Sequence, residues 1–392
     1  MIESARTWAL LLRLRRSSRL PPEEIERRQA RLLAGALAHA RENVPLYRRL
    51  WDGLPLELER LPVIGRAEVR AAFASGELPA DGVSALPSFP SSGTGGDPLE
   101  VPRGTTEARL WRAVALRTWF EHGHSWRDST VHFDRTPGPS HPLQRLGIAR
   151  TTWISPDLET GELRERFTAS HADIVAGTPT VLRRLCRVLG DVTHPPRAVF
   201  AEGEVLDRGT AELIQRGLGV APVDLYGLTE TGFIGWQCER REHLHVNAET
   251  CIVELLVDGR PARPGELGTV VVTTLLTRTA PMIRYDTGDL AMAVDGPCRC
   301  GRTPPLIGRI AGRAKEVLDG VTTREVVDHL APISLPDGYQ VHRSNGAYEL
   351  RAADDAVDAS ALAERLSGVL GGASVIPAPG FQPTKPKTRV VV

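Results

Sequence analysis

Residues 220–230, VAPVDLYGLTE, place an apolar stretch directly before a run of glycine, hydroxyl and acidic residues. The pattern from Val220 to Leu225 predicts a buried strand. Tyr226 to Glu230 would then lie at the carboxyl end of that strand, and open α/β sheets bind their ligands at this edge. The stretch therefore predicts both an element of the fold and the position of a site.

Segments that precede this stretch alternate between strand and helix patterns. Strands are expected over 129–133, 172–176 and 196–200. Helices are expected over 25–42, from 64, and over 107–122, 180–189 and 207–218. This alternation predicts an α/β layer with parallel strands.

After Glu230 the pattern becomes β-rich. Residues 251–257 and 268–274 resemble strands, and Asp258-Gly259 is a turn signal. We expect an antiparallel or barrel-like subdomain here. From about Arg309 a shorter α/β segment runs to the C-terminus.

Composition narrows the class of protein. The chain has 392 residues, is 41% hydrophobic and has 48 Lys+Arg against 48 Asp+Glu. This balance argues against a nucleic-acid or membrane-surface protein. No apolar run approaches the roughly 18 residues that span a bilayer, and the apolar start at 8–11 is too short for a signal peptide. We expect a cytoplasmic protein, in which five cysteines do not form a disulfide framework.

Lysine is rare in this chain. Lys315, Lys385 and Lys387 are its only lysines, so nearly every cation is an arginine. Lysine presents a compact charge and arginine a planar fork of donors. The three lysines are therefore candidates for positions that arginine cannot fill.

Three short segments carry recognisable chemistry: 91–96 (SSGTGG), 224–230 (DLYGLTE) and 284–289 (RYDTGD). Glycine-rich loops let backbone N–H groups surround phosphate oxygens, and hydroxyls add donors. A carboxylate that accepts two ribose hydroxyls is a common way to hold a nucleoside. In this order and spacing the segments resemble the adenylate-forming superfamily of acyl-CoA synthetases, peptide-synthetase adenylation domains and luciferases. The resemblance implies an ATP-dependent activator of carboxylic acids.

The resemblance also implies roles for individual residues. Tyr226 stacks on adenine, Asp224 lies near the adenine amine, Thr229 contacts the α-phosphate and Glu230 holds Mg²⁺. Asp289 and Arg313 approach the ribose. The implied nucleotide-binding residues are Ser91, Ser92, Gly93, Thr94, Gly95, Gly96, Glu202, Gly203, Asp224, Tyr226, Gly227, Asp289, Arg309 and Arg313.

The phosphate loop departs from the family pattern at one position. Asp97 stands where the family usually has a lysine. An aspartate repels polyphosphate unless a Mg²⁺ ion lies between them. The loop is therefore expected to contribute through its backbone and hydroxyls only.

In this superfamily a C-terminal lid rotates between two half-reactions. The resemblance implies a large N-terminal domain over 1–312, made of parallel α/β layers plus the β-rich part, and a small mobile α+β lid over 313–392. The hinge falls at Lys315. A lysine near the chain end contacts the reacting groups, and we favour Lys385, with Lys387 as the alternative.

Cys238, Cys298, Cys300 and either His243 or His245 have the chemistry of a closed tetrahedral zinc site. The phenylacetate-CoA ligase branch of the superfamily carries a Cys, then Leu-His-Val, then Cys-x-Cys-Gly-Arg-Thr. Residues 244–246 and 298–303 match this pattern, which implies His245 as the ligand. The zinc would be structural, within a β-rich part at about 236–305.

These observations predict activation of an aryl or aryl-like acid by ATP to an acyl-adenylate, followed by transfer to coenzyme A. The expected cofactors are ATP, Mg²⁺ and structural Zn²⁺. The acceptor stays open between coenzyme A, a carrier-protein thiol, an amine and another nitrogen nucleophile. An impaired nucleotide-binding homologue is a further alternative, favoured by Asp97. We expect a monomer or homodimer with no nucleic-acid or membrane partner.

Overall fold

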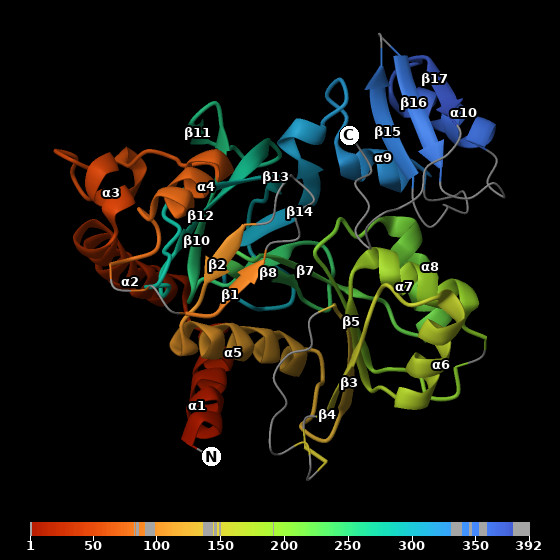
Figure 1. Ribbon diagram of the computed structural model, residues 1–392, viewed down its shortest axis with the longest axis horizontal. Coiled ribbons are helices and arrows are strands. Elements are labelled where there is room, and N and C mark those ends of the chain that lie inside the picture. Colours follow the sequence, from red (N-terminus) through yellow and green to blue (C-terminus); the bar gives the residue numbers. More distant parts are fainter. Residues whose placement is uncertain are drawn as a thin grey trace. The chain divides into compact units, whose positions relative to one another are not determined.

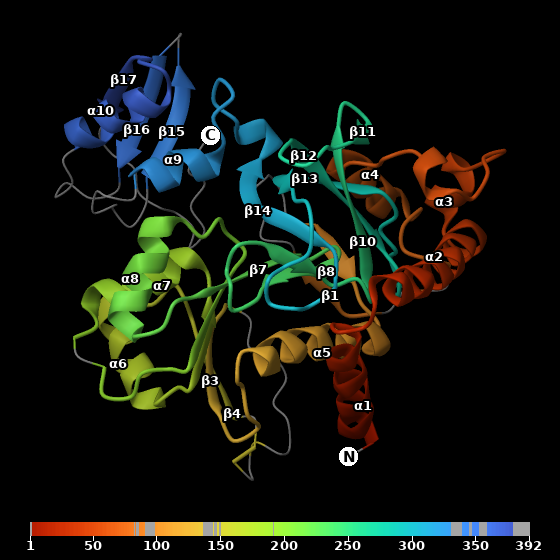
Figure 2. The same cartoon turned by 180° about the vertical axis from the view of Figure 1, so that it is seen from behind.

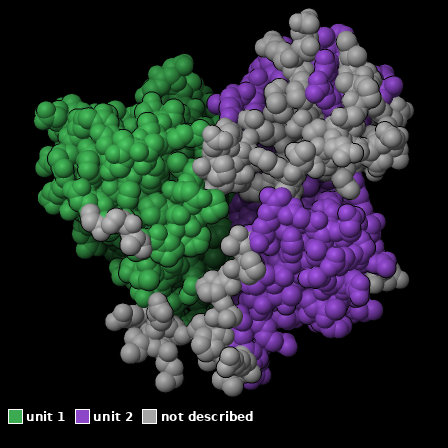
Figure 3. All heavy atoms as spheres, viewed as in Figure 1, with its two compact units in different colours: residues 1–121, 226–310 green, residues 122–225, 311–392 purple. Residues whose placement is uncertain are grey.

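The computed structural model has a mixed α/β fold (Figure 1). The residues that it describes are 2–81, 83, 86–90, 99–135, 144, 147–148, 150–190, 192–330, 339–344, 347–352 and 359–378. The chain divides into two compact units (Figure 3). Unit 1 comprises residues 1–121 and 226–310, and unit 2 comprises residues 122–225 and 311–392. The boundary between residues 225 and 226 falls at the end of the strand predicted over 220–225.

Unit 2 contains the predicted parallel layer. Its strands are β3 (Ser129–Phe133), β4 (Arg150–Ile154), β5 (Ile174–Gly177), β6 (Ala198–Glu202) and β7 (Val223–Leu228, up to residue 225). They lie in the order β7-β6-β5-β3-β4, and neighbouring strands run parallel. The prediction of parallel strands is confirmed. Strand β4 was not predicted.

Three helices pack against this layer (Figures 1 and 2): α6 (Thr160–Ser170), α7 (Pro179–Val188) and α8 (Arg208–Leu218). Apolar side chains of these helices and of β3 to β6 form one core. Helix α8 begins after Asp207, whose carboxylate accepts the Thr210 N–H at 2.8 Å. It ends at Gly219, whose φ of 77° suits a helix C-cap.

The C-terminal part of unit 2 has a small sheet and core of its own. Strands β15 (Tyr339–Ser344), β16 (Ala347–Ala352) and β17 (Val375–Ala378) lie in that order, the first pair antiparallel and the second parallel. Helices α9 (Thr323–Leu330) and α10 (Ala359–Val369) supply most of the other core side chains. This is an α+β arrangement, as predicted.

Unit 1 contains the β-rich part. In sheet order its strands are β11 (Arg260–Pro261), β10 (Cys251–Val257), β12 (Leu267–Thr274), β13 (Tyr285–Ala293), β14 (Leu306–Arg313, up to residue 310), β9 (Leu244–Val246) and β8 (Gly232–Gln237). The β10–β11, β10–β12, β12–β13, β9–β14 and β8–β9 pairs are antiparallel. Asp258 and Gly259 have φ values of 50° and 79° and form the two-residue turn between β10 and β11.

Helices and a small hairpin complete unit 1. The helices are α1 (Ile2–Ser17), α2 (Pro22–Asn43), α3 (Pro45–Leu50), the short η1 (Leu58–Arg60), α4 (Arg66–Ser75) and α5 (Thr105–Glu121). Strands β1 (Ser88–Pro90) and β2 (Glu100–Pro102) form the antiparallel hairpin. Helix α1 was not predicted, because its start was interpreted only as a short apolar run. Within the described ranges, no helix combines the length and apolarity that crossing a bilayer requires.

Candidate active site and metal centre

Two groups of predicted site residues lie outside the described residues. These are the phosphate loop (Ser91, Ser92, Gly93, Thr94, Gly95 and Gly96) and the two candidate catalytic lysines, Lys385 and Lys387. Their roles stay predictions. The hairpin on either side of the loop is described, with Ser88 opposite Pro102 and Pro90 opposite Glu100.

Unit 1 brings two predicted nucleotide residues into direct contact. The Tyr226 hydroxyl lies 2.9 Å from Asp289 Oδ2 and 3.3 Å from Thr287 Oγ1. Both Tyr226 and Asp289 are buried. Burial, and then the negative charge of Asp289, raise the pKa of Tyr226 well above its usual value. The phenol is therefore protonated and donates to the carboxylate.

The Thr229-Glu230 dipeptide is held by two arginines that sequence reasoning missed. Arg66 Nη1 lies 2.8 Å from Glu230 Oε1. Arg103 Nη2 donates to the Thr229 carbonyl oxygen at 3.0 Å. Nothing in the sequence distinguishes these two from the other arginines, since arginine supplies nearly every cation of the chain.

Arg103 is fixed by aromatic rings. Its guanidinium carbon lies 3.2 Å from the centre of the Trp111 ring and 4.5 Å from that of Phe89. Burial lowers the pKa of Arg103 to about 10, and the charge of Glu107 opposes this shift. A Cβ atom on Gly232, whose φ is 85°, would lie 2.6 Å from Trp111, so this ring packs directly on the turn that carries Glu230. The turn needs glycine at this position.

Gly227, on β7, also allows a close approach. A Cβ atom there would lie 2.8 Å from the Gly232 carbonyl oxygen. Real Cβ contacts are essentially never this short, so a side chain at Gly227 would push the Thr-Glu turn away. This packing explains the glycine without requiring a ligand contact.

Unit 2 carries other predicted nucleotide residues. Glu202 ends β6, and Gly203 follows with φ of 79°. Asp224 is buried in β7, with Oδ2 3.9 Å from Arg324 Nη2. Glu202 and Gly203 therefore lie at the carboxyl end of a parallel strand, the edge that the sequence predicted for the site.

The predicted interdomain segment lies along β14 and beyond. Arg309 and Arg313 are half-buried residues of this strand, and Lys315 is exposed in the short helix η3 (Ala314–Glu316). Gly312 has φ of 124°, and a Cβ atom there would lie 2.5 Å from Thr323 Cβ. Only glycine suits this backbone position, three residues before the predicted hinge.

The four predicted metal ligands converge. The ligand atoms of Cys238, His245, Cys298 and Cys300 all lie within 4.8 Å of one another. Cys238 Sγ and Cys298 Sγ are 3.7 Å apart, and Cys300 Sγ is 3.3 Å from His245 Nε2. The histidine of this group is His245.

These separations fit a tetrahedral ion better than a disulfide. Two sulfurs bound about 2.3 Å from one tetrahedral zinc ion lie about 3.8 Å apart, whereas disulfide sulfurs lie about 2.05 Å apart. Burial lowers the pKa of His245 to about 4, so its ring is neutral near pH 7. Its Nδ1 is buried without a hydrogen-bond partner in the described structure, and Nε2 faces the thiols. The donor set therefore fits zinc.

A buried charge network links this cluster to helix α5. Arg302 donates its backbone N–H to Cys300 Sγ at 3.4 Å. Its guanidinium contacts Glu121 at 2.8 Å and Glu239 at 2.7 Å, and lies over the Trp236 ring at 5.3 Å. The salt bridge to Glu121 is buried on both sides. The sequence showed Arg302 only as part of the Cys-x-Cys-Gly-Arg-Thr match.

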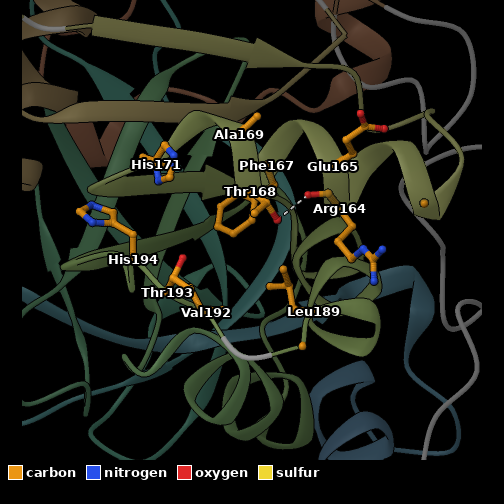
Figure 4. Close-up of a pocket in the computed structure, with 13 residues that line it drawn as sticks. Arg164, Glu165, Phe167, Thr168, Ala169, His171, Leu189, Val192, Thr193 and His194 are labelled. Carbon is orange, nitrogen blue, oxygen red and sulfur yellow. Dashed lines mark hydrogen bonds between the residues drawn. The ribbon is translucent and has the colours of Figure 1, made fainter.

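A separate hollow of about 650 Å³ lies in unit 2, between α6 and the loop after α7 (Figure 4). His171 and His194 lie on one side of it, and Arg164 and Glu165 on the other. Its lining includes Ala172 and Thr193, which precede β5 and β6 in the chain. Among the described residues, none of the predicted nucleotide or metal ligands lines it.

Sequence comparisons relate the chain to proteins named as phenylacetate-coenzyme A ligases. No protein-family model matches the chain. Phenylacetate-coenzyme A ligase of Thermus thermophilus is 26% identical over 325 residues, which cover 76% of this chain and 72% of that protein. The Escherichia coli enzyme of the same name is 26% identical over 323 residues, with the same coverage. In sequence the chain is similar to these phenylacetate-coenzyme A ligases.

Solved structures support the fold assignment. A 2-hydroxyisobutyryl-CoA ligase in the post-adenylation state, in complex with 2-HIB-AMP, has a TM-score of 0.76 and 21% identity, covering 96% of this chain and 91% of that one. The same ligase in complex with 2-HIB-AMP and CoA gives a TM-score of 0.64. The fold is that of the adenylate-forming acyl-CoA ligases, as the sequence predicted.

Proposed function

We propose that this protein activates a carboxylic acid with ATP, releases pyrophosphate, and transfers the acyl group from the adenylate to coenzyme A. The observation that carries the proposal is the hydrogen bond between Tyr226 and Asp289, together with the burial of Glu230 in the turn after β7. These residues come from two of the three segments that resemble the superfamily. The sequence similarity to phenylacetate-coenzyme A ligases and the fold shared with a ligase that holds 2-HIB-AMP support it.

In the first half-reaction a carboxylate oxygen of the acid attacks the α-phosphorus of ATP. The bond from that phosphorus to the bridging oxygen breaks, and pyrophosphate leaves with the electron pair. Thr229 would donate a hydrogen bond to the α-phosphate, and Glu230 would hold the Mg²⁺ that accompanies ATP. Such groups stabilise the charge that develops on the phosphoryl oxygens. Lys385, or alternatively Lys387, would bring the final positive charge.

The C-terminal part would act as the lid. We place its start at 313 and its hinge at Lys315, which is exposed three residues after Gly312. The separate sheet and core of residues 318–378 favour a segment that moves as one body. Closure of such a lid excludes water, which would otherwise hydrolyse the adenylate.

Zinc would be held by Cys238, His245, Cys298 and Cys300 and would be structural. Four protein ligands leave no open position for a substrate, and the network through Arg302 connects the site to α5 rather than to the Thr-Glu turn. When bound, the ion would cross-link the segment before β9 to the segment before β14. The cytoplasmic location and the monomeric or dimeric state stay predictions.

The first experiment measures pyrophosphate release from the purified protein with ATP, Mg²⁺ and a panel of aryl and small aliphatic acids. We expect release with at least one acid, and mass analysis should identify an acyl-CoA thioester only when coenzyme A is added. Pyrophosphate release without an acyl-CoA thioester would indicate a different acyl acceptor: a carrier-protein thiol, an amine or another nitrogen nucleophile. If no acid supports release, the activation step itself is wrong.

A further inference from the structure

Arg66 and Glu230 form an ion pair with very unequal exposure. Their closest atoms lie 2.8 Å apart, and the side chain of Glu230 is 2% exposed whereas that of Arg66 is 30% exposed. A buried carboxylate without a counter-charge is strongly unfavourable. Arg66 therefore supplies the positive charge that compensates the buried Glu230 carboxylate.

Backbone hydrogen bonds fix the chain just before Arg66 against β13, the strand that carries Asp289. Ile64 pairs with Tyr285 as an isolated parallel bridge. The Ile64 N–H donates to the Arg284 carbonyl at 3.0 Å, and the Asp286 N–H donates to the Ile64 carbonyl at 2.8 Å. Two residues later, Arg66 begins helix α4. The main chain is thus fixed at this point, while the guanidinium at the end of a long side chain reaches the carboxylate.

Under the proposed function, two cations compete for the Glu230 carboxylate: the Arg66 guanidinium and Mg²⁺. A Mg²⁺ ion bound to a carboxylate oxygen at about 2.0–2.1 Å would place two positive charges within a few ångströms of the Arg66 guanidinium. The repulsion between them is large where water is excluded. The polyphosphate of ATP, however, brings several negative charges, and the planar fork of arginine is well suited to bind phosphate oxygens.

We propose that Arg66 is an exchangeable counter-ion: it pairs with Glu230 when no nucleotide is bound and moves to the polyphosphate when Mg²⁺ and ATP bind together. This inference rests on the proposed function. Arg66 would supply the cation that the phosphate loop lacks, because Asp97 stands at the loop position where a lysine is expected. Arg103 is not suited to this role, since two rings and the Thr229 carbonyl hold its guanidinium in place.

The exchange makes nucleotide and metal binding depend on each other. While Arg66 is paired with Glu230, the carboxylate is neutralised and a positive charge lies beside it. Both effects weaken the binding of a divalent ion without ATP. With ATP present, the phosphates attract Arg66 and the carboxylate becomes available to the ion. The wild-type protein is therefore expected to bind Mn²⁺, used in place of Mg²⁺, only in the presence of ATP.

The test uses the full-length protein with Arg66→Ala, Arg66→Gln and Arg66→Lys. Isothermal titration measures ATP affinity with Mg²⁺, and AMP affinity as the reference that lacks the β- and γ-phosphates. We expect Arg66→Ala to weaken ATP binding about tenfold or more, the size typical of hydrogen bonds between charged groups, and AMP binding by less than about threefold. Arg66→Lys should lie between wild type and Arg66→Ala. Arg66→Gln keeps a donor for Glu230 without the charge and should resemble Arg66→Ala.

Arg49→Ala is the matched control. Arg49 forms a two-bond ion pair with Glu77 in the same unit, with separations of 2.9 and 2.7 Å, but this pair is on the surface. The Arg49→Ala variant should leave the ATP and AMP affinities unchanged.

Electron paramagnetic resonance should detect Mn²⁺ binding to the Arg66→Ala variant without nucleotide, because the buried Glu230 carboxylate has lost its partner.

Equal losses for ATP and AMP, or no loss for either, would show that Arg66 only supports the fold and would overturn the proposal. If Arg66→Ala does not fold, the same comparison on Arg66→Gln decides it. Failure of the wild-type protein to bind ATP would overturn the proposed function itself. Equal ATP binding by wild type and variant would overturn only the role of Arg66.

Discussion

Tyr226 and Asp289 illustrate how residues implied to bind a ligand can also hydrogen-bond each other. The resemblance implies that Tyr226 stacks on adenine and that Asp289 accepts the ribose hydroxyls. In the structure the Tyr226 hydroxyl donates to Asp289. A buried carboxylate needs donors whether or not a nucleotide is bound. Ribose hydroxyls would therefore join or replace a donor that the protein already provides.

Tyr226→Phe tests this interpretation. The substitution keeps the ring and removes the donor, so we expect the nucleotide-free protein to lose about 1–3 kcal/mol of stability, the usual cost of leaving a buried acceptor unsatisfied. Saturating AMP should recover part of the loss, because ribose hydroxyls can donate to Asp289. Thermal melts of both proteins with and without AMP measure it. An equal AMP-induced rise in Tm for wild type and variant would contradict the interpretation.

At the scale of elements, the Cys/His cluster ties short segments together. Cys238 follows β8, His245 lies in β9, and Cys298 and Cys300 precede β14. Strand β9 has only three residues and pairs with β14 at Leu306 and Ile307. Short strands bury little apolar surface, so a bound ion would contribute much of the order in this region.

The other two cysteines provide an internal control for the metal proposal. Burial raises the pKa of both Cys186 and Cys251 to about 12, so neither thiol is reactive near pH 7. In protein purified without chelator, a thiol reagent should label few cysteines. After chelation it should label Cys238, Cys298 and Cys300, while Cys186 and Cys251 react only on unfolding. Peptide mass mapping identifies the labelled sites, and metal analysis should find about one zinc per chain.

A different labelling pattern would count against zinc. If all three cluster thiols react at full rate before chelation and no metal is found, the four residues form a reduced apolar cluster instead. Cys238→Ser should then leave the melting temperature almost unchanged, whereas loss of a zinc ligand should lower it clearly.

At the scale of the whole molecule, the compact units do not follow the order of the chain. Residues 122–225 and 311–392 share unit 2 because they contact one another. Arg324 Nη1 donates to the Leu206 carbonyl at 3.0 Å, and Asp328 accepts the Arg208 N–H at 2.7 Å. The lid boundary at 313 stays a prediction.

Two histidines with lowered pKa values predict how the molecule responds to acid. The His132 ring stacks on Trp153, with centroids 4.6 Å apart, and burial lowers its pKa to about 4. Burial also lowers the pKa of His124, although Asp128 opposes the shift. An unfolded histidine has a pKa of about 6.5, so between pH 6.5 and 4 the unfolded chain binds more protons than the native one. Stability is therefore present above pH 6.5 and is lost as the pH falls towards 4.

Thermal melts from pH 8 to pH 5 measure this effect. We expect Tm to fall by several degrees below pH 6.5, and His132→Gln should reduce the slope because it removes one of the titrating groups. Work with zinc-saturated protein keeps metal release apart from histidine protonation. An identical slope for His132→Gln and wild type would exclude His132 as a contributor.

Much of the fold was predictable because its signals are local. The alternation of apolar strands and amphipathic helices predicted β3, β5, β6, α7 and α8, and Asp258-Gly259 predicted the β10–β11 turn. Helix α6 and strand β4 were missed. Strand β4 alternates exposed and half-buried residues before Ile154 and carries little apolar signal.

By itself the sequence determined the class of fold, the order of the three nucleotide segments, and the identity of the four candidate metal ligands. Those properties depend on neighbouring residues and on spacing along the chain. Only the tertiary structure decided that Tyr226 donates to Asp289, that Arg66 neutralises Glu230, and that Arg302 joins the Cys/His cluster to α5. These partners are 63, 164 and 181 positions apart in the chain. A buried polar or charged group pairs with whichever partner the fold brings close to it. A local sequence pattern does not show which residue that is.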